Sequence, residues 1–108
     1  MFHTLIETAD EVSLQILQHP KFPAGQIVAT PGALAALEIH AVSPLQLLAR
    51  HLNGDWGSVP VEDAQLNDEA LHTGGRLLSS YPIGPDTRVW ILSEADRSAT
   101  TLLMPSEY

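Results

Sequence analysis

The stretch "RLLSSYPIGPDTRVWILSEADRSATTLLM", residues 76–104, decides the fold. It contains three runs rich in β-branched, aromatic and other apolar residues, at 76–83, 87–93 and 98–104. The segments between them, "GPD" and "EADR", are turn-type sequences of hairpin length. The stretch therefore predicts three consecutive antiparallel strands.

The preceding residues predict helices and one further strand. Thr30-Pro31 and Ser43-Pro44 each place a capping hydroxyl before a proline, which is a helix-start signal. Asn53-Gly54 and Gly74-Gly75 are helix-stop signals, because these residues tolerate the left-handed conformation. The predicted elements are a strand at 25–30, which can add a fourth strand to the sheet, and helices at 31–40, 44–52 and 61–73.

Helices followed by a meander of strands define an α+β fold. We expect the N-terminal helices to pack on one face of a C-terminal antiparallel sheet of three to four strands. Residues 25–108 form a single α+β domain in this interpretation, and residues 1–24 an N-terminal extension. Apolar residues recur at helical spacing from Leu5 to Ile16, so the extension is predicted to be partly helical.

Composition narrows the possible functions. The chain of 108 residues has no cysteine, which excludes disulfides and thiol catalysis. Thirteen acids against five bases give a net charge of −8, so free nucleic acid is an unlikely partner. No apolar run reaches the length of a membrane span and no basic signal sequence begins the chain, so we expect a cytoplasmic protein that does not bind membranes.

The segment "RHLNGDWG", residues 50–57, is the first candidate site. Arg50 and His51 lie in the last predicted turn of a helix, where cations offset the negative end of the dipole. The same dipole is expected to raise the pKa of His51 and make it a proton donor near neutrality. Asp55 is placed to orient the imidazole, and Trp56 is either a corner anchor or a stacking platform for a ligand. Helix capping and function both remain open interpretations.

The sheet adds three residues to this candidate site. Tyr81 lies on the first strand of the meander, and Glu94 and Arg97 lie in its second turn. If these elements converge, His51, Tyr81, Glu94 and Arg97 form a cleft with an acid/base, an orienting group, a base and an anion binder. A solvated turn is the alternative. The candidate catalytic residues are His51, Tyr81 and Glu94, and the candidate binding residues are Arg50, Asp55, Trp56 and Arg97.

Cofactor and metal signatures are absent from the sequence. There is no GxGxxG, P-loop, GxSxG or HExxH motif, and the histidines have no mutual ligand spacing. We therefore predict neither a metal nor a cofactor.

Several segments taken together carry a family resemblance: "GQIVATPGALAAL", "SPLQLLARHLNGDWG", "EDAQLNDEAL", "RLLSSY" and "VWILSEADRSATTLLMPSEY". They resemble a family of uncharacterised bacterial proteins of about this length, which are found around plasmids, phages and other mobile elements. Some members carry the automatic label "type I restriction endonuclease subunit M". The resemblance covers residues 25–108 and implies a connection with mobile elements, without an established activity.

Three functions follow as hypotheses. The first is a small protein that binds a protein or nucleoprotein partner, since the chain is short, acidic and without a complete catalytic signature. The second is a small nuclease- or transferase-type enzyme acting on nucleic acid or nucleotide through the cleft described above. The third is an acidic inhibitor that mimics phosphates. It predicts residues 62, 63, 68 and 69 on one exposed face with no basic residue among them.

Overall fold

The computed structural model describes residues 3–4 and 20–108. The helix predicted in the N-terminal extension falls on residues outside this range, apart from Thr4, which belongs to a short strand. The described elements in chain order are β1 (His3–Thr4), β2 (Gln26–Ala29), α2 (Pro31–Ile39), α3 (Pro44–Leu52), α4 (Val61–Thr73), β3 (Leu77–Gly84), β4 (Thr87–Ser93), β5 (Ala99–Leu103) and the 3₁₀ helix η2 (Pro105–Glu107).

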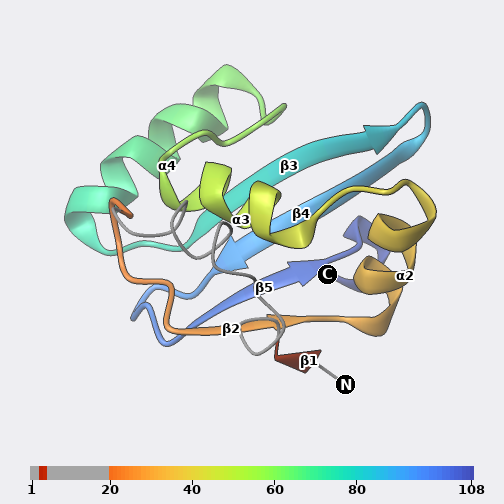
Figure 1. Cartoon of the computed structure of the whole chain (residues 1–108). Coiled ribbons are helices and arrows are strands. Elements are labelled where there is room, and N and C mark those ends of the chain that lie inside the picture. Colours follow the sequence, from red (N-terminus) through yellow and green to blue (C-terminus); the bar gives the residue numbers. More distant parts are fainter. Residues whose placement is uncertain (1–2, 5–19) are drawn as a thin grey trace.

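The α+β prediction is confirmed, with a sheet of order β1-β2-β5-β4-β3. The meander β3-β4-β5 is antiparallel, as predicted. Strand β2 joins the sheet beside β5 but runs parallel to it, so the sheet is mixed. The three helices carry the chain from β2 to the far edge at β3, and the meander then returns to β2 (Figure 1).

The predicted helix boundaries are close to the observed ones, although the Ser43 hydroxyl makes no capping hydrogen bond at the start of α3. The Thr30 hydroxyl accepts a hydrogen bond from the Ala33 amide at 3.0 Å, which caps α2. The chain leaves α3 and α4 through Gly54 and Gly74, which have φ values of 81° and 87°. A side chain at such a φ is strained, so glycine is the favoured residue at both stops.

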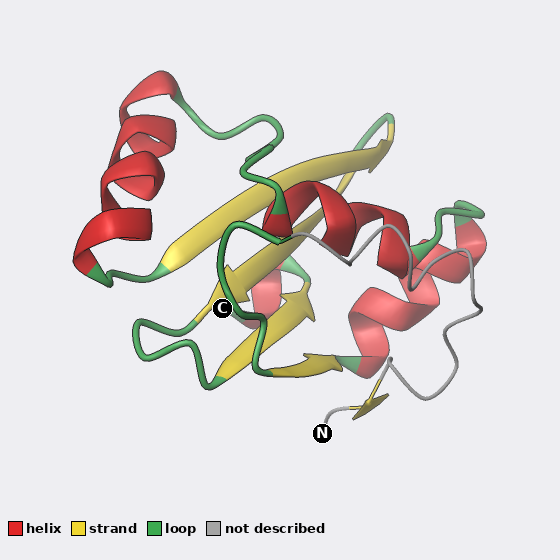
Figure 2. Cartoon of the chain, turned by 60° about the vertical axis from the view of Figure 1, so that its left-hand side comes forward, coloured by secondary structure: helices red, strands yellow, loops and turns green. Residues whose placement is uncertain are grey.

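Helices α2 and α3 cover one face of the sheet, which we call the inner face (Figure 2). Leu45, Leu48 and Leu52 of α3 are buried there, as their spacing predicts. Phe22, from the expected N-terminal extension, is buried in the same core. The strands contribute alternate residues to this face, among them Ile27, Leu77, Ser79, Tyr81, Val89, Ile91, Ser93, Thr100 and Leu102.

Helix α4 lies beside the edge strand β3 (Figure 1), and its Asn67 side chain hydrogen-bonds to the backbone of that strand. The Asn67 amide donates to the Leu78 carbonyl at 2.8 Å and accepts from the Leu78 amide at 3.2 Å. Two positions on, the Ser80 amide donates to the Trp56 carbonyl, and the Ser80 carbonyl accepts from the Ser58 amide. This edge is therefore closed to pairing with another chain.

No single helix in the described residues is long and apolar enough to cross a membrane. Helices α2 and α3 satisfy the length and composition test only as a pair, and that pair is bent by 110°.

Candidate functional site

His51 is fully buried between α3 and the inner face of the sheet, with no exposed surface. Its Nδ1 lies 2.6 Å from the Ser79 Oγ on β3, and its Nε2 lies 2.9 Å from the Ser93 Oγ on β4. The rings of Phe22 and Trp56 contact the imidazole edge-to-face. Because both ring nitrogens are hydrogen-bonded and no part of the ring reaches solvent, His51 is placed to join elements rather than to meet a ligand.

The hydrogen bonds around His51 fix its tautomer. The Thr100 hydroxyl donates to the Ala24 carbonyl at 2.8 Å. It therefore accepts in its 2.7 Å bond with Ser93, whose only hydroxyl hydrogen is thereby used. Ser93 must then accept from His51 Nε2–H, and Ser79 donates to Nδ1. The result is a chain of hydrogen bonds, Ser79–His51–Ser93–Thr100–Ala24, with a neutral imidazole.

The expectation of a raised His51 pKa is wrong. Burial, with a smaller contribution from the positive charge of Arg97, lowers the pKa of His51 from its ordinary 6.5 to about 3. Desolvation outweighs the helix dipole here because the ring is fully buried and both of its nitrogens are bonded to neutral hydroxyls. His51 is therefore not a proton donor near neutrality.

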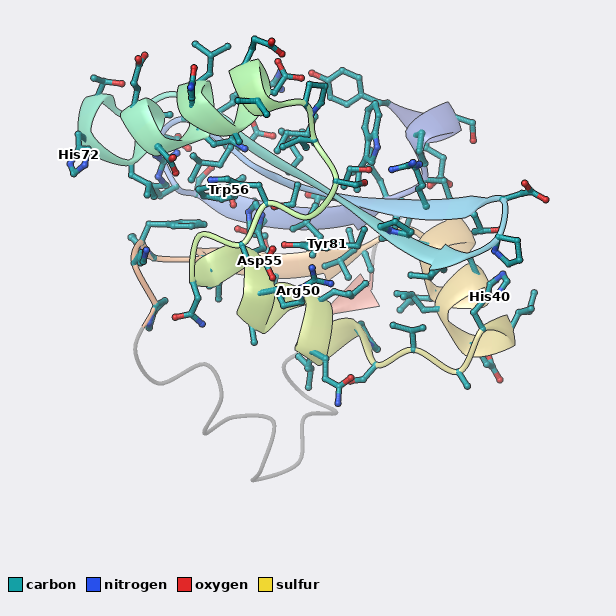
Figure 3. The ribbon with its side chains drawn as sticks, turned by 90° about the horizontal axis from the view of Figure 1, so that it is seen from above. His40, Arg50, Asp55, Trp56, His72 and Tyr81 are labelled. Atoms are coloured by element: carbon teal, nitrogen blue, oxygen red, sulfur yellow. The ribbon has the colours of Figure 1, made fainter. Side chains whose placement is uncertain are left out.

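Arg50, Asp55 and Tyr81 form a separate cluster at the end of α3 (Figure 3). Arg50 Nε lies 2.7 Å from Asp55 Oδ2, and the guanidinium carbon lies 4.5 Å from the centre of the Tyr81 ring. The buried Tyr81 hydroxyl donates to the Asp55 backbone carbonyl at 2.5 Å, and burial raises its pKa. The Asp55 carboxylate also accepts from the Gly57 amide at 3.1 Å. Asp55 thus binds Arg50 and the turn, and it does not orient His51.

Trp56 is a buried anchor of the same corner. Its ring stacks on Phe22 with a centroid separation of 6.5 Å, and its Nε1 donates to the Asp68 carboxylate of α4 at 2.9 Å. The carbonyl of Trp56 also pairs with the edge of β3. With 5% of its surface exposed, Trp56 offers no stacking platform.

Arg97 and Glu94 are used in structural contacts. Arg97, which has a φ of 60°, donates to the carbonyl oxygens of Ala70, Gly75 and Glu94 at distances between 2.6 and 3.0 Å. Its guanidinium therefore satisfies the C-terminal end of α4 and the residues after it. The Glu94 carboxylate is paired with Arg76 at 3.4 Å.

The structure thus does not join the three predicted catalytic residues and Arg97 through hydrogen bonds in one cleft. Among the described residues, His51 has no hydrogen bond to Tyr81, Glu94 or Arg97. The four side chains have different partners: two serines for His51, the Asp55 carbonyl for Tyr81, Arg76 for Glu94, and the carbonyls of Ala70, Gly75 and Glu94 for Arg97. The direct acid–base cooperation that the enzyme hypothesis requires is therefore missing.

The side of the sheet opposite the inner face, which we call the outer face, has two open hollows among the described residues. One, of about 390 Å³, lies between the start of α4 and the strands, and the other, of about 560 Å³, lies between the β3–β4 turn and η2. Arg88 lines both hollows, and half-buried Trp90 lines the first. Neither hollow is lined by His51, Tyr81 or Glu94.

Arg88 and Trp90 are not among the residues predicted for the site. The alternation in "TRVWILS" does place both on one face of β4, opposite Val89, Ile91 and Ser93. This alternation, however, does not indicate that α2 and α3 cover the Val89 face and leave the other face accessible.

The four acids that the phosphate-mimic hypothesis requires are all exposed on α4. Two of them have further contacts, since Asp63 lines the smaller hollow and the Asp68 carboxylate accepts from Trp56 Nε1. No group of three or more histidine, aspartate and glutamate residues in the described parts of the chain is placed to hold a metal ion.

Comparison with protein-family models gave no match, and searches of curated proteins and of solved structures gave no significant match.

Proposed function

We propose that this chain is a binding protein that holds a protein or nucleoprotein partner on the outer face of its sheet. The observation that carries this proposal is the pair of aromatic side chains there, half-buried Trp90 and exposed Tyr108. The two rings meet edge-to-face with centroids 5.6 Å apart, and 64% of Tyr108 is exposed. Aromatic side chains with one open side are typical anchors of protein–protein interfaces.

The form of the outer face supports the same proposal. Arg88 lines both hollows, the start of α4 borders the smaller one, and η2 borders the larger one. Such a surface is suited to a partner that contributes side chains to both hollows. The net charge of −8 favours a partner whose remaining contacts are basic or neutral. The family resemblance leads us to propose that this partner acts in the cytoplasm in connection with a mobile element.

Site-specific photo-crosslinking tests the proposal. A photoreactive p-benzoylphenylalanine replaces Tyr108 in one variant and Ile39 in another, since Ile39 is 79% exposed at the end of α2, a helix of the inner face, and lines neither hollow. Each variant is irradiated in a lysate of cells that carry the gene, at low and at high salt. We expect a discrete crosslinked product from position 108 and none from position 39.

Trp90→Ala provides the matched binding variant, and Ile39→Ala its control. Loss of the position-108 crosslink in Trp90→Ala, with retention in Ile39→Ala, supports an outer-face interface. If position 108 yields no product at either salt concentration, or if both positions yield the same products, the proposal is wrong.

A further inference from the structure

The four arginines of the described chain differ in their partners. Arg50 and Arg76 pair with the carboxylates of Asp55 and Glu94. Arg97 donates to three backbone carbonyls. Arg88 alone among them contacts only hydroxyl groups, those of Ser58 and, at 3.5 Å, Ser80. In a chain with 13 acids, the Arg88 guanidinium thus has neither a carboxylate nor a backbone carbonyl as a hydrogen-bond partner in the described residues, and Arg88 lines a hollow.

The smaller hollow has the composition of a ligand site. Val59, Pro60, Leu78 and Trp90 supply apolar lining, and Arg88 with its serine partners Ser58 and Ser80 forms a polar cluster in the same lining. Its volume of about 390 Å³ is near the lower end of the range for ligand pockets. The hollow therefore matches a short group that is apolar in its body and anionic at one end.

We propose that this hollow binds the free carboxylate of an apolar C-terminal residue, presented by the partner protein. A guanidinium binds a carboxylate through two parallel hydrogen bonds, which a neutral amide cannot reproduce. In a C-terminal residue the carboxylate and the apolar side chain share one Cα, so both fit a hollow of this size. An internal aspartate or glutamate lacks the apolar group beside its carboxylate.

The charge of the whole chain favours one kind of anion at this site. Asp63 lines the same hollow as Arg88, so the local charge is balanced before a ligand arrives. Arg88 attracts and Asp63 repels a phosphate dianion about twice as strongly as a carboxylate, so this pair does not discriminate between the two. The overall charge of −8 repels the dianion more strongly than the carboxylate. The site thus favours a carboxylate over a phosphate.

This inference rests on the proposed function, and NMR titration of the full-length ¹⁵N-labelled protein tests it separately. The probe is the peptide acetyl-Gly-Ser-Leu with a free C-terminus, and its C-terminal amide and inorganic phosphate are the controls. We expect saturable shifts at the Arg88 side chain and the Trp90 indole with the acid, and at least about ten-fold weaker binding of the amide. We expect no saturable shifts at these two groups with phosphate.

Two arginine variants make the test specific. Arg88→Gln removes the proposed anchor, and Arg76→Gln removes the same charge next to Tyr108, outside the hollow. We expect Arg88→Gln to abolish the shifts and Arg76→Gln to retain them. Equal binding of acid and amide, phosphate binding as tight as that of the acid, or equal weakening by both variants overturns the inference.

The crosslinking experiment separates the two proposals. If Arg88→Gln retains the position-108 crosslink while Trp90→Ala loses it, the carboxylate site is wrong and the outer-face interface stands. If wild-type protein gives no crosslink at position 108, the interface itself is wrong.

Discussion

The inner and outer faces of the sheet are built from alternate residues of the same strands, yet their polar groups differ in their partners. On the inner face, Ser79, Ser93 and Thr100 enclose His51 in a chain in which each hydrogen bond fixes the next. On the outer face, Ser80 touches an exposed guanidinium that has no carboxylate partner.

The difference between the two faces indicates which polar groups of this small domain are able to bind a ligand. A polar group in a closed, buried chain must be satisfied internally, because an unpaired one costs about 1–3 kcal/mol. It therefore contributes to the stability and uniqueness of the core. A charged group at the rim of a hollow has water as its default partner, so it can exchange that water for a ligand.

The largest effect on stability is expected from a substitution on the inner face. His51→Ala removes the ring and leaves Ser79 and Ser93 without their common partner. We expect a loss of about 3–5 kcal/mol in the free energy of unfolding, from the cavity and the unpaired hydroxyls together. Urea denaturation measures the loss. His72→Ala, at an exposed position of α4, is the control and should change stability by less than about 0.5 kcal/mol. A loss below about 1 kcal/mol in His51→Ala would show that the chain of hydrogen bonds is not a major source of stability.

The next prediction concerns the pH dependence of the inner face. The folded protein holds His51 neutral down to about pH 3, whereas the unfolded chain protonates it near its ordinary pKa of 6.5. The unfolded state therefore binds more protons below pH 6.5, and acidification destabilises the fold. The expected slope is about 1.4 kcal/mol per pH unit below that point.

Urea denaturation of wild type and His51→Gln between pH 7 and 5 measures this slope, in a range where most carboxylates stay charged. Glutamine keeps one donor and one acceptor but does not titrate. We expect the steeper loss in wild type, and identical slopes would rule out His51 as its source.

The smallest effect on stability is expected from a substitution on the outer face. Arg88→Gln removes a charge that contacts only two hydroxyls, at an exposed position. We expect the free energy of unfolding to change by no more than about 0.5 kcal/mol. Thermal and urea denaturation measure the change. A loss above about 1 kcal/mol would mean that Arg88 is a structural residue, and the contrast between the faces would fail.

The candidate site was harder to predict than the fold. Arg50, Asp55 and Trp56 do belong together at one corner, since they lie within seven residues of one another. The partners of His51, in contrast, lie 28 and 42 residues away in the sequence. No local pattern indicates that two serines on different strands meet one imidazole, so the sequence favoured a charged histidine at a helix end over a neutral one in the core.

The sequence by itself determined the elements of this protein, because its signals are local. The Thr30 cap marked the start of α2, Gly54 and Gly74 marked the ends of α3 and α4, and the alternation of residues set the faces of the strands. The tertiary structure alone decided the parallel pairing of β2 with β5, the closure of the β3 edge by Asn67, and the burial of His51. It also decided that Arg88 has no carboxylate partner among the described residues. Each of these depends on residues that are distant in the chain and come together only when the core excludes water.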